Sequence, residues 1–466
     1  MPIENLQNYL SLLEQHDQLA RIKAPADPIL EIAAITDRVC KQPGGGRALL
    51  FEHPSGSSFA VATNLFGSLK RVCLALGIDH PGRLHDRLGE LLDRIPEIDF
   101  PNLDRQLAGL PEFSRFAAVD TKEADPELIS AAQPDLTRFP FLQSWPRDGS
   151  SSGHGRYITL PQVFTSSPEG SNPNCGLYRA QIRGPRELAI QWKTGSGAAR
   201  QAAEFLSRGE KMPVAIVLGG DPAMLFSAML PLPGNLDETA FAGFLRGEAL
   251  RTATCGTVPL RVPAGAEVVI EGYVEAGDTV TEGPFGNHTG SYSPATPAAL
   301  MRVSAIRHRP DAIVPATVVG PPPMEDCWMA VAWERLLLAF LQKLLPELAD
   351  IHFPFEWVFH QSAIISLENP RPGMVREMAE KLWRLPWFAS ARMLVFVDAT
   401  CKPLELRRAA WQCINLLEYR HDLIHDAATG RTALDATGCR SPRNRTETDQ
   451  DIARLVGRRW REYGLA

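Results

Sequence analysis

The sequence lacks the features that would place the protein in a specialised class. Its 466 residues carry 48 lysines and arginines against 54 aspartates and glutamates, a formal net charge of −6, so no basic excess indicates a nucleic-acid or anionic-membrane partner. None of the eight cysteines belongs to a CxxC pair. Scattered cysteines in a chain large enough to bury its own core are typical of reduced thiols, which predicts a cytoplasmic protein.

Long apolar runs are also missing. The first ten residues, MPIENLQNYL, have no basic segment followed by an apolar one, so we expect no secretory signal peptide. The most apolar long stretch, residues 328–345, is too interrupted to span a bilayer. The interrupting residues are Glu334, Arg335, Gln342 and Lys343. We therefore expect a soluble protein.

The short motifs of several common enzyme classes do not occur either. The chain has no Walker loop, no GxSxG nucleophile elbow and no HExxH zinc helix. The segment GSGAAR, from Gly195, is only loosely similar to a phosphate loop and is interpreted as an ordinary turn before a helix. His421 and His425 have the spacing of two metal ligands on a helix, but no third ligand is near them in sequence. A surface pair is the better interpretation.

The composition is that of a folded globular chain. It is 44% hydrophobic and 22% charged, which excludes a mostly disordered or fibrous protein. The length predicts about three domains. The 38 prolines and 36 glycines predict many turns and edge segments between short elements.

Hydrophobic patterns assign a fold class to the first two parts of the chain. A helix over residues 4–16, a second helix that opens at Asp27 and Pro28, and the strand-like run RALLFEH predict a small α/β domain that ends near residue 110. Between residues 157 and 309, short apolar runs alternate with turn-forming residues. This pattern favours a β-rich domain such as a barrel, with one helix inserted over residues 198–208.

The pattern after Pro323 is α/β again. Helices and strands alternate there, beginning with a long amphipathic helix and ending with a charged helical segment. The expected elements are a helix over 327–345, the strand VFHQSAIISLE, a helix over 373–385, the strand MLVFVD, a helix over 404–417 and a helical end around 452–463.

One segment of the β-rich part carries polar side chains around a short apolar run. In NPNCGLYRAQI, residues 172–182, Asn174 and Arg179 lie five positions apart. One strand and its preceding turn bring both within reach of one cavity. The pair is therefore a candidate for ligand binding.

A second segment combines glycine and proline with ionisable groups. In TEGPFGNHTGSYSP, residues 281–294, a tightly shaped loop holds an acid, an amide and an imidazole, which are Glu282, Asn287 and His288. Glycine next to ionisable groups indicates a ligand-clamping loop. A structural β-turn with incidental charges is the alternative.

At these two segments the sequence resembles the UbiD-type decarboxylases. Members of that family act reversibly on aromatic and α,β-unsaturated acids with prenylated FMN. The resemblance extends over nearly the whole chain and is closest to the branch that acts on polyprenyl-4-hydroxybenzoates. Its blocks include LLFEHPSG, NCGLYRAQI, PVAIVLGGDPA, EGPFGNHTGSYS, PPPMED and LPELADIHFP, in this order.

The resemblance implies an α/β fold in three domains. A small N-terminal α/β domain would cover residues 1–110, and a central flavin-reductase-like split β-barrel, which holds the cofactor, would cover 111–315. An α/β domain with dimerising helices would cover 316–466. Family members are homodimers, or hexamers built from dimers, and a UbiX-type prenyl-flavin synthase supplies their cofactor.

The resemblance also implies catalytic roles. Arg179 matches the family's strand arginine, which binds the substrate carboxylate or the cofactor with its planar guanidinium. Glu282 matches the first acid of the family's loop, and it would pair with Arg179 and help move a proton. The family's second acid falls on Asn287, and an amide delivers no proton. Glu282, His288 or ordered water would then supply it, while Asn287 either hydrogen-bonds a polar group of the substrate or serves as a turn residue.

A metal is implied by the same resemblance. The family's Mn²⁺, or Mg²⁺, bridges the flavin phosphate to three side chains, which fall on Asn174, Gln191 and Glu238. Gln191 stands where the family has a histidine, and its amide oxygen is still a suitable ligand. K⁺ would lie near the carbonyl groups of residues 227–230. The other expected flavin contacts are Thr159 and Arg392.

Three functions follow as hypotheses. The first is decarboxylation of a 4-hydroxybenzoate-type acid in quinone synthesis. The second is decarboxylation of a dihydroxynaphthoate in menaquinone synthesis, or degradative decarboxylation or carboxylation of a phenolic or heteroaromatic acid. The third is a non-catalytic flavin-binding paralogue, which the replacements at Asn287 and Gln191 favour. The four matching residues favour an enzyme: Asn174, Arg179, Glu238 and Glu282.

Overall fold

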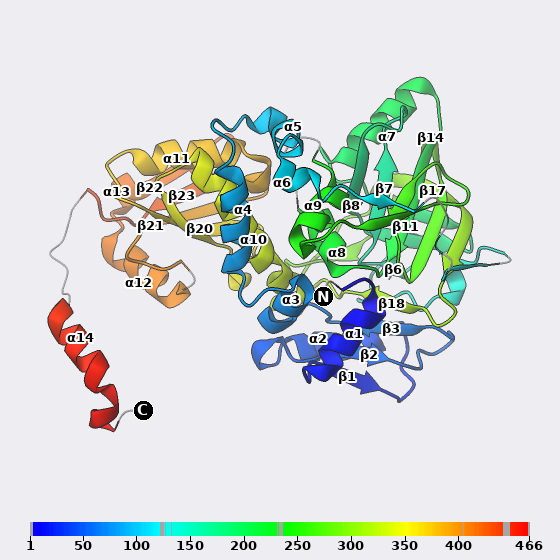
Figure 1. The fold of residues 1–466 in the computed structure, drawn as a ribbon, viewed down its shortest axis with the longest axis horizontal. Helices are drawn as coiled ribbons and strands as arrows, with labels where there is room; N and C mark the ends of the chain where they lie inside the picture. The colour runs from blue at the N-terminus through cyan, green and yellow to red at the C-terminus, as the bar shows by residue number, and fades with distance from the viewer. Residues whose placement is uncertain are drawn as a thin grey trace.

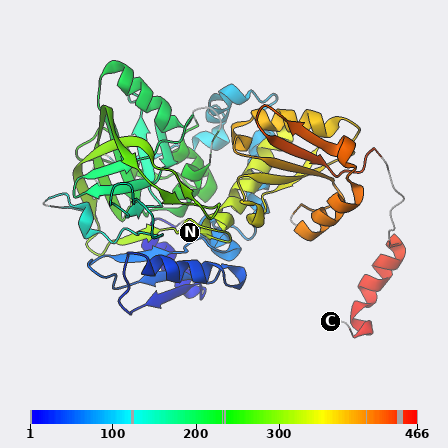
Figure 2. The same ribbon diagram turned by 180° about the vertical axis from the view of Figure 1, so that it is seen from behind.

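Three β-sheets organise the chain in the computed structural model (Figure 1). The structure describes residues 3–121, 125, 127–131, 133–230, 232, 236–403, 405–440 and 448–464. Helices α4 (Gly82–Leu92) and α10 (Glu325–Leu344) pack against each other beside the C-terminal sheet, as the view from behind in Figure 2 also shows. The N-terminal and central sheets lie on the other side of this helix pair.

The N-terminal sheet has four strands in the order β1-β2-β3-β18. Its last strand comes from residue 313 onward, so the chain returns to the first sheet after completing the second. Helix α1 packs on it through Leu6, Leu10 and Leu13, which have the expected helical spacing. The elements are α1 (Leu6–Gln15), β1 (Leu19–Ile22), α2 (Glu31–Cys40), β2 (Ala48–Phe51), β3 (Ala60–Thr63), α3 (Leu69–Leu76), β18 (Ile313–Ala316), α5 (Leu103–Ala108) and α6 (Pro111–Ser114).

The predicted start of the second helix is wrong. The pattern Asp27-Pro28 indicates a helix that opens there, but α2 begins at Glu31, after Leu30 with a φ of 70°. The Asp27 carboxylate accepts a hydrogen bond from the Ile29 amide, and Glu31 accepts one from the Asp27 amide. These bonds close a turn before the helix, so Asp27 is a turn residue and not the helix cap.

The central sheet is large and curled. It has nine strands, of which eight follow the order β6-β9-β10-β17-β14-β11-β7-β8 and β5 pairs with β17. The two long antiparallel strands β14 and β17 run from the pair Val268–His308 to the pair Glu282–Thr296. The segment between them therefore leaves the sheet at Glu282. The strands are β5 (Ile129–Ser130), β6 (Tyr157–Ile158), β7 (Gln162–Ser166), β8 (Pro173–Leu177), β9 (Ala180–Gly184), β10 (Glu187–Ile190), β11 (Met212–Leu218), β14 (Val268–Glu282) and β17 (Thr296–His308).

Three helices, a small three-stranded sheet and a two-stranded hairpin complete the central part. The predicted inserted helix is present as α7, which is capped at its start by Ser196 and ends at Gly209 in the left-handed conformation. The helices are α7 (Gly197–Arg208), α8 (Pro222–Met229) and α9 (Glu238–Arg246). The short strands are β4 (Val119–Asp120) with β12 (Arg251–Thr254) and β13 (Arg261–Pro263), and the hairpin β15 (Phe285–Gly286) with β16 (Tyr292–Ser293).

The C-terminal sheet has five strands in the order β19-β20-β21-β23-β22. The expected strand VFHQSAIISLE is shorter than predicted, because residues 358–361 form a turn in which Val358 has a φ of 53°. His421 and His425 do not share a helix, since a short helix ends between them. The elements are β19 (Leu348–His352), β20 (Ser362–Leu367), α11 (Met374–Arg384), β21 (Met393–Asp398), α12 (Leu406–Leu416), α13 (Tyr419–Asp422), β22 (Leu423–Asp426), β23 (Arg431–Asp435) and α14 (Gln450–Arg459).

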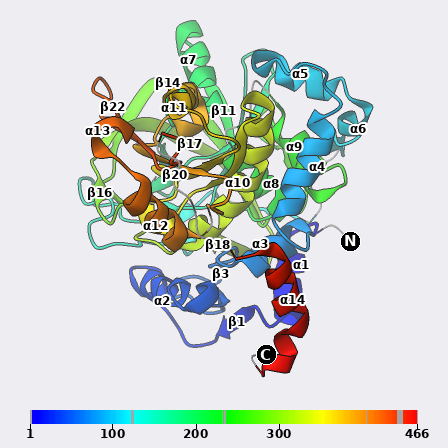
Figure 3. The same ribbon diagram turned by 90° about the vertical axis from the view of Figure 1, so that its left-hand side faces the viewer.

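Helix α14 stands apart from the three sheets. Figures 1 and 2 show it as a separate rod beyond the C-terminal sheet, Figure 3 shows it from the side, and it has no buried residue. Among the described residues, no helix combines the length and the apolar composition needed to cross a membrane.

Candidate active site

A buried ion pair between Arg179 and Glu282 forms the centre of the candidate site. Arg179 lies between β8 and β9, and Glu282 is the last residue of β14. Nε of Arg179 donates to Oε1 of Glu282 at 2.9 Å, and Nη2 donates to Oε2 at 2.8 Å. The Glu282 side chain is fully buried, whereas 24% of the Arg179 side chain is exposed. The pair therefore has an accessible face on the arginine side.

Two aromatic rings surround this pair. The Arg179 guanidinium carbon lies 4.4 Å from the centroid of the Phe285 ring, a cation–π contact. The Tyr157 ring lies 4.8 Å from that of Phe285. Burial, and to a smaller extent the nearby Glu282 carboxylate, raises the pKa of Tyr157, so its hydroxyl stays protonated at neutral pH. The pair is thus held in an apolar wall that excludes water.

A hairpin carries the chain onward from Glu282. Its first strand is fixed to the central part by Asp148, whose carboxylate accepts hydrogen bonds from the Gly286 amide at 2.8 Å and from the Trp145 amide at 2.8 Å. Gly286 has no room for a side chain, because a Cβ there would lie 2.2 Å from the Trp145 ring. The glycine of the EGPFG segment is therefore required for close packing.

Asn287 is bound within its own turn. Its Oδ1 accepts hydrogen bonds from the Thr289 amide at 2.9 Å and the Thr289 hydroxyl at 2.6 Å. Its Nδ2 donates to the Ser293 hydroxyl at 2.8 Å. This arrangement is an Asx turn, and it favours the interpretation of Asn287 as a turn residue.

His288 points away from its own hairpin toward the C-terminal part. Its Nδ1 lies 2.8 Å from Oδ2 of Asp326, in the first turn of α10. Its ring also packs edge-on against His360, with the ring centroids 5.0 Å apart, and against Phe359. The structure therefore brings His288 to a contact that the sequence did not predict.

Two of the three predicted metal ligands lie side by side. Glu238 is the first residue of α9, and its Oε2 accepts a hydrogen bond at 3.0 Å from the amide of Cys175, the neighbour of Asn174. Burial raises the pKa of Glu238 to about 8, and the Cys175 amide offsets this only in part. A carboxylate in this position is one that a divalent cation would keep ionised.

Asn174 also lies against the start of α7. A Cβ on Gly197 would lie 1.8 Å from Oδ1 of Asn174, and Nδ2 of Asn174 donates to the Thr165 hydroxyl at 3.1 Å. The amide oxygen thus faces a helix N-terminus, where backbone N–H groups favour anions such as phosphate. The GSGAAR turn therefore belongs to this region, although its sequence alone indicates only an ordinary turn.

The third predicted ligand is bound elsewhere. Oε1 of Gln191 accepts a hydrogen bond from the Thr296 hydroxyl at 3.1 Å, at the start of β17. Its backbone amide lies 3.5 Å from the carbonyl of Arg179. Among the described residues, no three His, Cys, Asp or Glu side chains group as a metal site. Asn174 and Gln191 would bind a metal through amide oxygens, which are not among those side chains. The set of Asn174, Gln191 and Glu238 therefore stays a prediction.

The remaining predicted positions each have hydrogen-bond partners elsewhere in the fold. The Thr159 hydroxyl accepts a hydrogen bond from the Thr317 amide at 3.0 Å. The predicted K⁺ region, residues 227–230, forms the end of α8, and the Ser227 hydroxyl donates to the Glu238 carbonyl at 2.7 Å. Arg392 is exposed just before β21, and its amide donates to the carbonyl of Gln361 in the turn that also carries His360.

Sequence reasoning missed several residues of the site. Tyr157, Asp148 and Gly197 line or shape it, and Asp326 and His360 contact its hairpin. Asp326 lies in the PPPMED block, which was singled out as a motif without a role for its acids. The other residues carry no signal in one sequence, because their contacts connect segments far apart in the chain.

Comparisons with known proteins agree with this architecture. Three family models match consecutive parts of the chain: the N-terminal domain of 3-octaprenyl-4-hydroxybenzoate carboxy-lyase at residues 10–92, its Rift-related domain at 118–322 and its C-terminal domain at 327–446. An uncharacterised protein of Archaeoglobus fulgidus is 36% identical over 427 residues, which is 91% of this chain and 86% of that one. An uncharacterised protein of Aquifex aeolicus is 36% identical over 430 residues, 90% of this chain and 86% of that one.

Solved structures confirm the predicted α/β fold. The closed form of a vanillic acid decarboxylase from Sedimentibacter hydroxybenzoicus has a TM-score of 0.84 at 24% identity, covering 99% of each chain. An evolved dimeric form of the UbiD-class enzyme HmfF from Pelotomaculum thermopropionicum, in complex with prFMN, has a TM-score of 0.79 at 23% identity, covering 98% of this chain and 100% of that one. The apo 3,4-dihydroxybenzoic acid decarboxylase of Klebsiella pneumoniae has a TM-score of 0.75 at 18% identity, covering 98% and 99%.

Proposed function

The chain belongs to the UbiD family of carboxy-lyases, and from that membership we propose that it catalyses the reversible, non-oxidative decarboxylation of an aromatic carboxylic acid with prenylated FMN. The observation that carries this proposal is the two-bond ion pair of Arg179 with the fully buried Glu282. It holds a guanidinium for the substrate carboxylate and an acid–base group in one place.

Arg179 is the group that binds the carboxylate. A guanidinium has five N–H donors, and Glu282 occupies two of them, at Nε and Nη2. The donors on the exposed side are available to an anionic ligand. Because Glu282 neutralises much of the arginine charge, the site holds the substrate carboxylate without stabilising it so strongly that loss of CO₂ becomes unfavourable.

Glu282 is the group that handles the proton. In the forward reaction the bond between the ring carbon and the carboxyl carbon breaks, CO₂ leaves, and a proton takes its place on the same ring carbon. Glu282 is buried beside Arg179 and Phe285, where bulk water does not compete for that proton. Asn287 is occupied by its turn and has no proton to deliver.

The residues present fit a flavin phosphate and its divalent cation. Glu238 is a buried carboxylate whose pKa rises to about 8 in the absence of a cation, and Asn174 faces the N-terminus of α7 across Gly197. Glu238 and Asn174 would hold Mn²⁺ or Mg²⁺, with Gln191 as the third ligand, and the first turn of α7 would face the phosphate. When bound, prenylated FMN supplies the electron-accepting centre that loss of CO₂ from an aromatic ring requires.

The substrate proposed is a 4-hydroxybenzoate-type acid of quinone biosynthesis. The match of all three family models to 3-octaprenyl-4-hydroxybenzoate carboxy-lyase supports it. The structural neighbours are enzymes for vanillic and 3,4-dihydroxybenzoic acids, which supports a hydroxyarene carboxylate as the broader class. A small phenolic acid without a polyprenyl tail is the second candidate.

The experiment is a screen of aromatic acids for CO₂ release, with the protein produced alongside a UbiX-type prenyl-flavin synthase. We expect release from 4-hydroxybenzoate-type acids and a visible flavin absorbance in the purified protein. Protein produced without the synthase is the control and should release no CO₂. Flavin-loaded protein that releases no CO₂ from any acid, and exchanges no ring proton in ²H₂O, would leave the flavin-binding paralogue as the function.

A further inference from the structure

The contact of His288 with Asp326 connects two parts of the molecule that the sheets keep separate. His288 lies on the hairpin that follows Glu282, in the central part. Asp326 lies in the first turn of α10, and His360 lies in the turn before β20. The Nδ1–Oδ2 distance is 2.8 Å, and the His288 and His360 rings are 5.0 Å apart. One hairpin side chain thus meets two elements of the C-terminal part.

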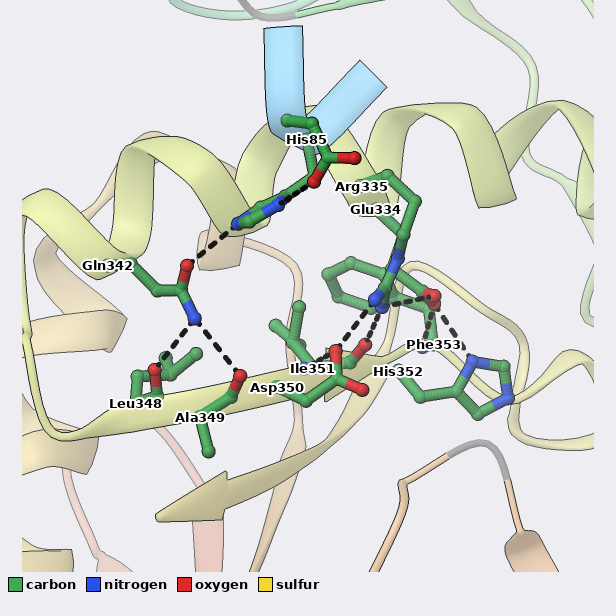
Figure 4. Close-up of polar contacts among 11 residues, drawn as sticks. His85, Glu334, Arg335, Gln342, Leu348, Ala349, Asp350, Ile351, His352 and Phe353 are labelled. Atoms are coloured by element: carbon green, nitrogen blue, oxygen red, sulfur yellow. Dashed lines mark hydrogen bonds and ion pairs between the residues drawn. The ribbon is translucent and has the colours of Figure 1, made fainter. Parts of the chain in front are cut away.

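Helix α10 is firmly attached to that part. Glu334 in α10 is 1% exposed and accepts hydrogen bonds from the Phe353 amide at 2.7 Å and from Nδ1 of His352 at 2.9 Å (Figure 4). Arg335 reaches Asp350 at 2.7 Å. These bonds tie the middle of α10 to β19, so a side chain in its first turn has a fixed position relative to the C-terminal sheet.

The same helix is tied to the N-terminal part at its other end. Nε2 of His85 in α4 lies 2.8 Å from Oε1 of Gln342 (Figure 4). Nε2 of Gln342 donates to the carbonyls of Leu348 at 3.2 Å and Ala349 at 3.0 Å. Asp326 therefore projects from a helix that is held at its middle and its end.

The hairpin is anchored at its base by the central part, where the Arg147 amide donates to the Tyr292 hydroxyl at 3.1 Å and the Ser151 hydroxyl donates to the Gly283 carbonyl. Asp148 binds the Gly286 amide at its base, and the turn of Asn287 closes its tip. Beyond these bonds, the tip residue His288 reaches outward to Asp326 and is 25% exposed there. We infer that Asp326 is a positioning residue for this enzyme. It holds His288 in a fixed position relative to the C-terminal part, and with His288 it holds the hairpin that follows Glu282.

The groups around His288 favour one fixed position of its ring. The Asp326 side chain is 17% exposed, and both of its carboxylate oxygens are buried; the 2.8 Å approach to Nδ1 of His288 is a close polar contact without hydrogen-bond geometry. Burial, and then the neighbouring His288, lowers the pKa of His360 to about 4, so His360 is neutral at neutral pH and adds no competing charge. Asp326 is left as the anionic group that faces the His288 ring.

The test is amide hydrogen–deuterium exchange of the full chain at residues 285–293. Asp326→Asn keeps the shape of the side chain but removes its charge, and His288→Gln removes the imidazole. Each should speed exchange of the hairpin by about tenfold, which corresponds to about 1.4 kcal/mol. The double variant should be no faster than either single one, because both remove the same contact. Asp17→Asn, a surface acid with 81% of its side chain exposed, is the matched control.

Two outcomes would overturn the inference. Faster exchange confined to residues 325–330 would assign Asp326 only to the start of its own helix, where an acid is favourable in any protein. Additive effects in the double variant would show that the two residues act independently. His288→Gln changes a partly exposed tip residue, so it keeps the test valid if Asp326→Asn does not fold.

Only the catalytic consequence of this inference rests on the proposed function. Both single variants should lose decarboxylation while they retain the flavin absorbance. The exchange measurement needs no substrate. A chain that releases no CO₂ from any acid but still shows the coupled exchange would contradict the proposed function and leave the positioning contact intact.

Discussion

The two halves of the candidate site differ in whether the buried carboxylate has a charged partner. In the Arg179–Glu282 pair every charge has its partner, with both bonds below 3 Å. Glu238 as a whole residue is half-buried, but burial of its carboxylate raises its pKa to about 8, and the Cys175 amide donates a hydrogen bond to it. The fold therefore gives Glu282 a charged partner, whereas the hydrogen-bond donor that it gives Glu238 is a neutral amide.

This difference has a physical cause. A buried carboxylate is stable as an anion only with a cationic or strongly hydrogen-bonding partner, because burial removes its solvation. Arg179 provides that partner for Glu282. For Glu238 the chain provides the neutral Cys175 amide of β8, so the proposed divalent ion would be its cationic partner. The comparison predicts that substitutions at Arg179 and Glu282 lower activity whether or not metal is added. Substitutions at Glu238 should lower activity by weakening metal binding.

The largest effect is expected for Glu282→Gln. The amide keeps the size of the side chain but neither carries the proton nor neutralises Arg179, so decarboxylation and exchange of the substrate ring proton should both fall by about 10³-fold or more. Steady-state CO₂ release and NMR of the ring proton in ²H₂O measure the two. Glu275→Gln, an exposed acid on the same strand, is the control. Ring-proton exchange at the unaltered rate would contradict the role of Glu282.

Arg179→Lys should be the next largest. Lysine keeps the charge but cannot form two parallel bonds to Glu282, so kcat/KM should fall by about 100-fold with the metal content unchanged. Metal analysis and kinetics on the same preparation measure this. Arg183→Lys, on the following strand, is the control. Equal losses in the two variants would show that arginine geometry at position 179 has no special role.

A buried acid outside the site tests the electrostatic part of the argument. Burial raises the pKa of Glu325 to about 7, above its ordinary value of 4.5. Its contribution to stability is therefore full below pH 4.5 and is lost as the pH rises through 7. Glu325→Gln should reduce the fall in unfolding free energy between pH 5 and 8 by about 2 kcal/mol, measured by urea unfolding. An unchanged pH dependence would show that burial does not raise this pKa.

The smallest effect is expected for Glu238→Gln. The amide still offers an oxygen but no charge, so the affinity for Mn²⁺ should fall about tenfold, measured by metal analysis after dialysis against a series of free Mn²⁺ concentrations. Excess Mn²⁺ should restore flavin binding in this variant, whereas it should not restore kcat/KM in the Arg179 variant. Glu248→Gln, an exposed acid just after the same helix, is the control. Equal Mn²⁺ affinity in the variant and the parent would remove Glu238 from the metal site.

Much of the fold was predictable because its signals are local. The helical spacing of Leu6, Leu10 and Leu13, the serine before α7 and the apolar run of β21 each depend on a few neighbouring residues. The prediction failed at Asp27, where two side-chain hydrogen bonds to backbone amides close a turn in place of a helix cap. Several turn conformations compete for such a pattern, and packing selects among them.

The site was predictable only as far as its motifs reach. Glu282, Asn287 and His288 were found because one compact segment carries them, and Arg179 because it lies in a second segment. Asp326 was missed, since nothing in a single sequence relates a helix start to a hairpin 38 positions earlier. The turn role of Asn287 depends on Thr289 and Ser293, whose hydrogen bonds only the folded hairpin reveals.

The sequence by itself determined the three-part organisation, the family and the two segments that carry the chemistry, because these reside in local patterns and in the order of matched blocks. Only the tertiary structure decided that Arg179 and Glu282, 103 positions apart, form a two-bond ion pair. It also decided that Glu238 accepts a hydrogen bond from the Cys175 backbone amide and not from a basic side chain. Charge pairing and burial arise where distant segments meet, so they are properties of the packed sheet and not of any segment alone.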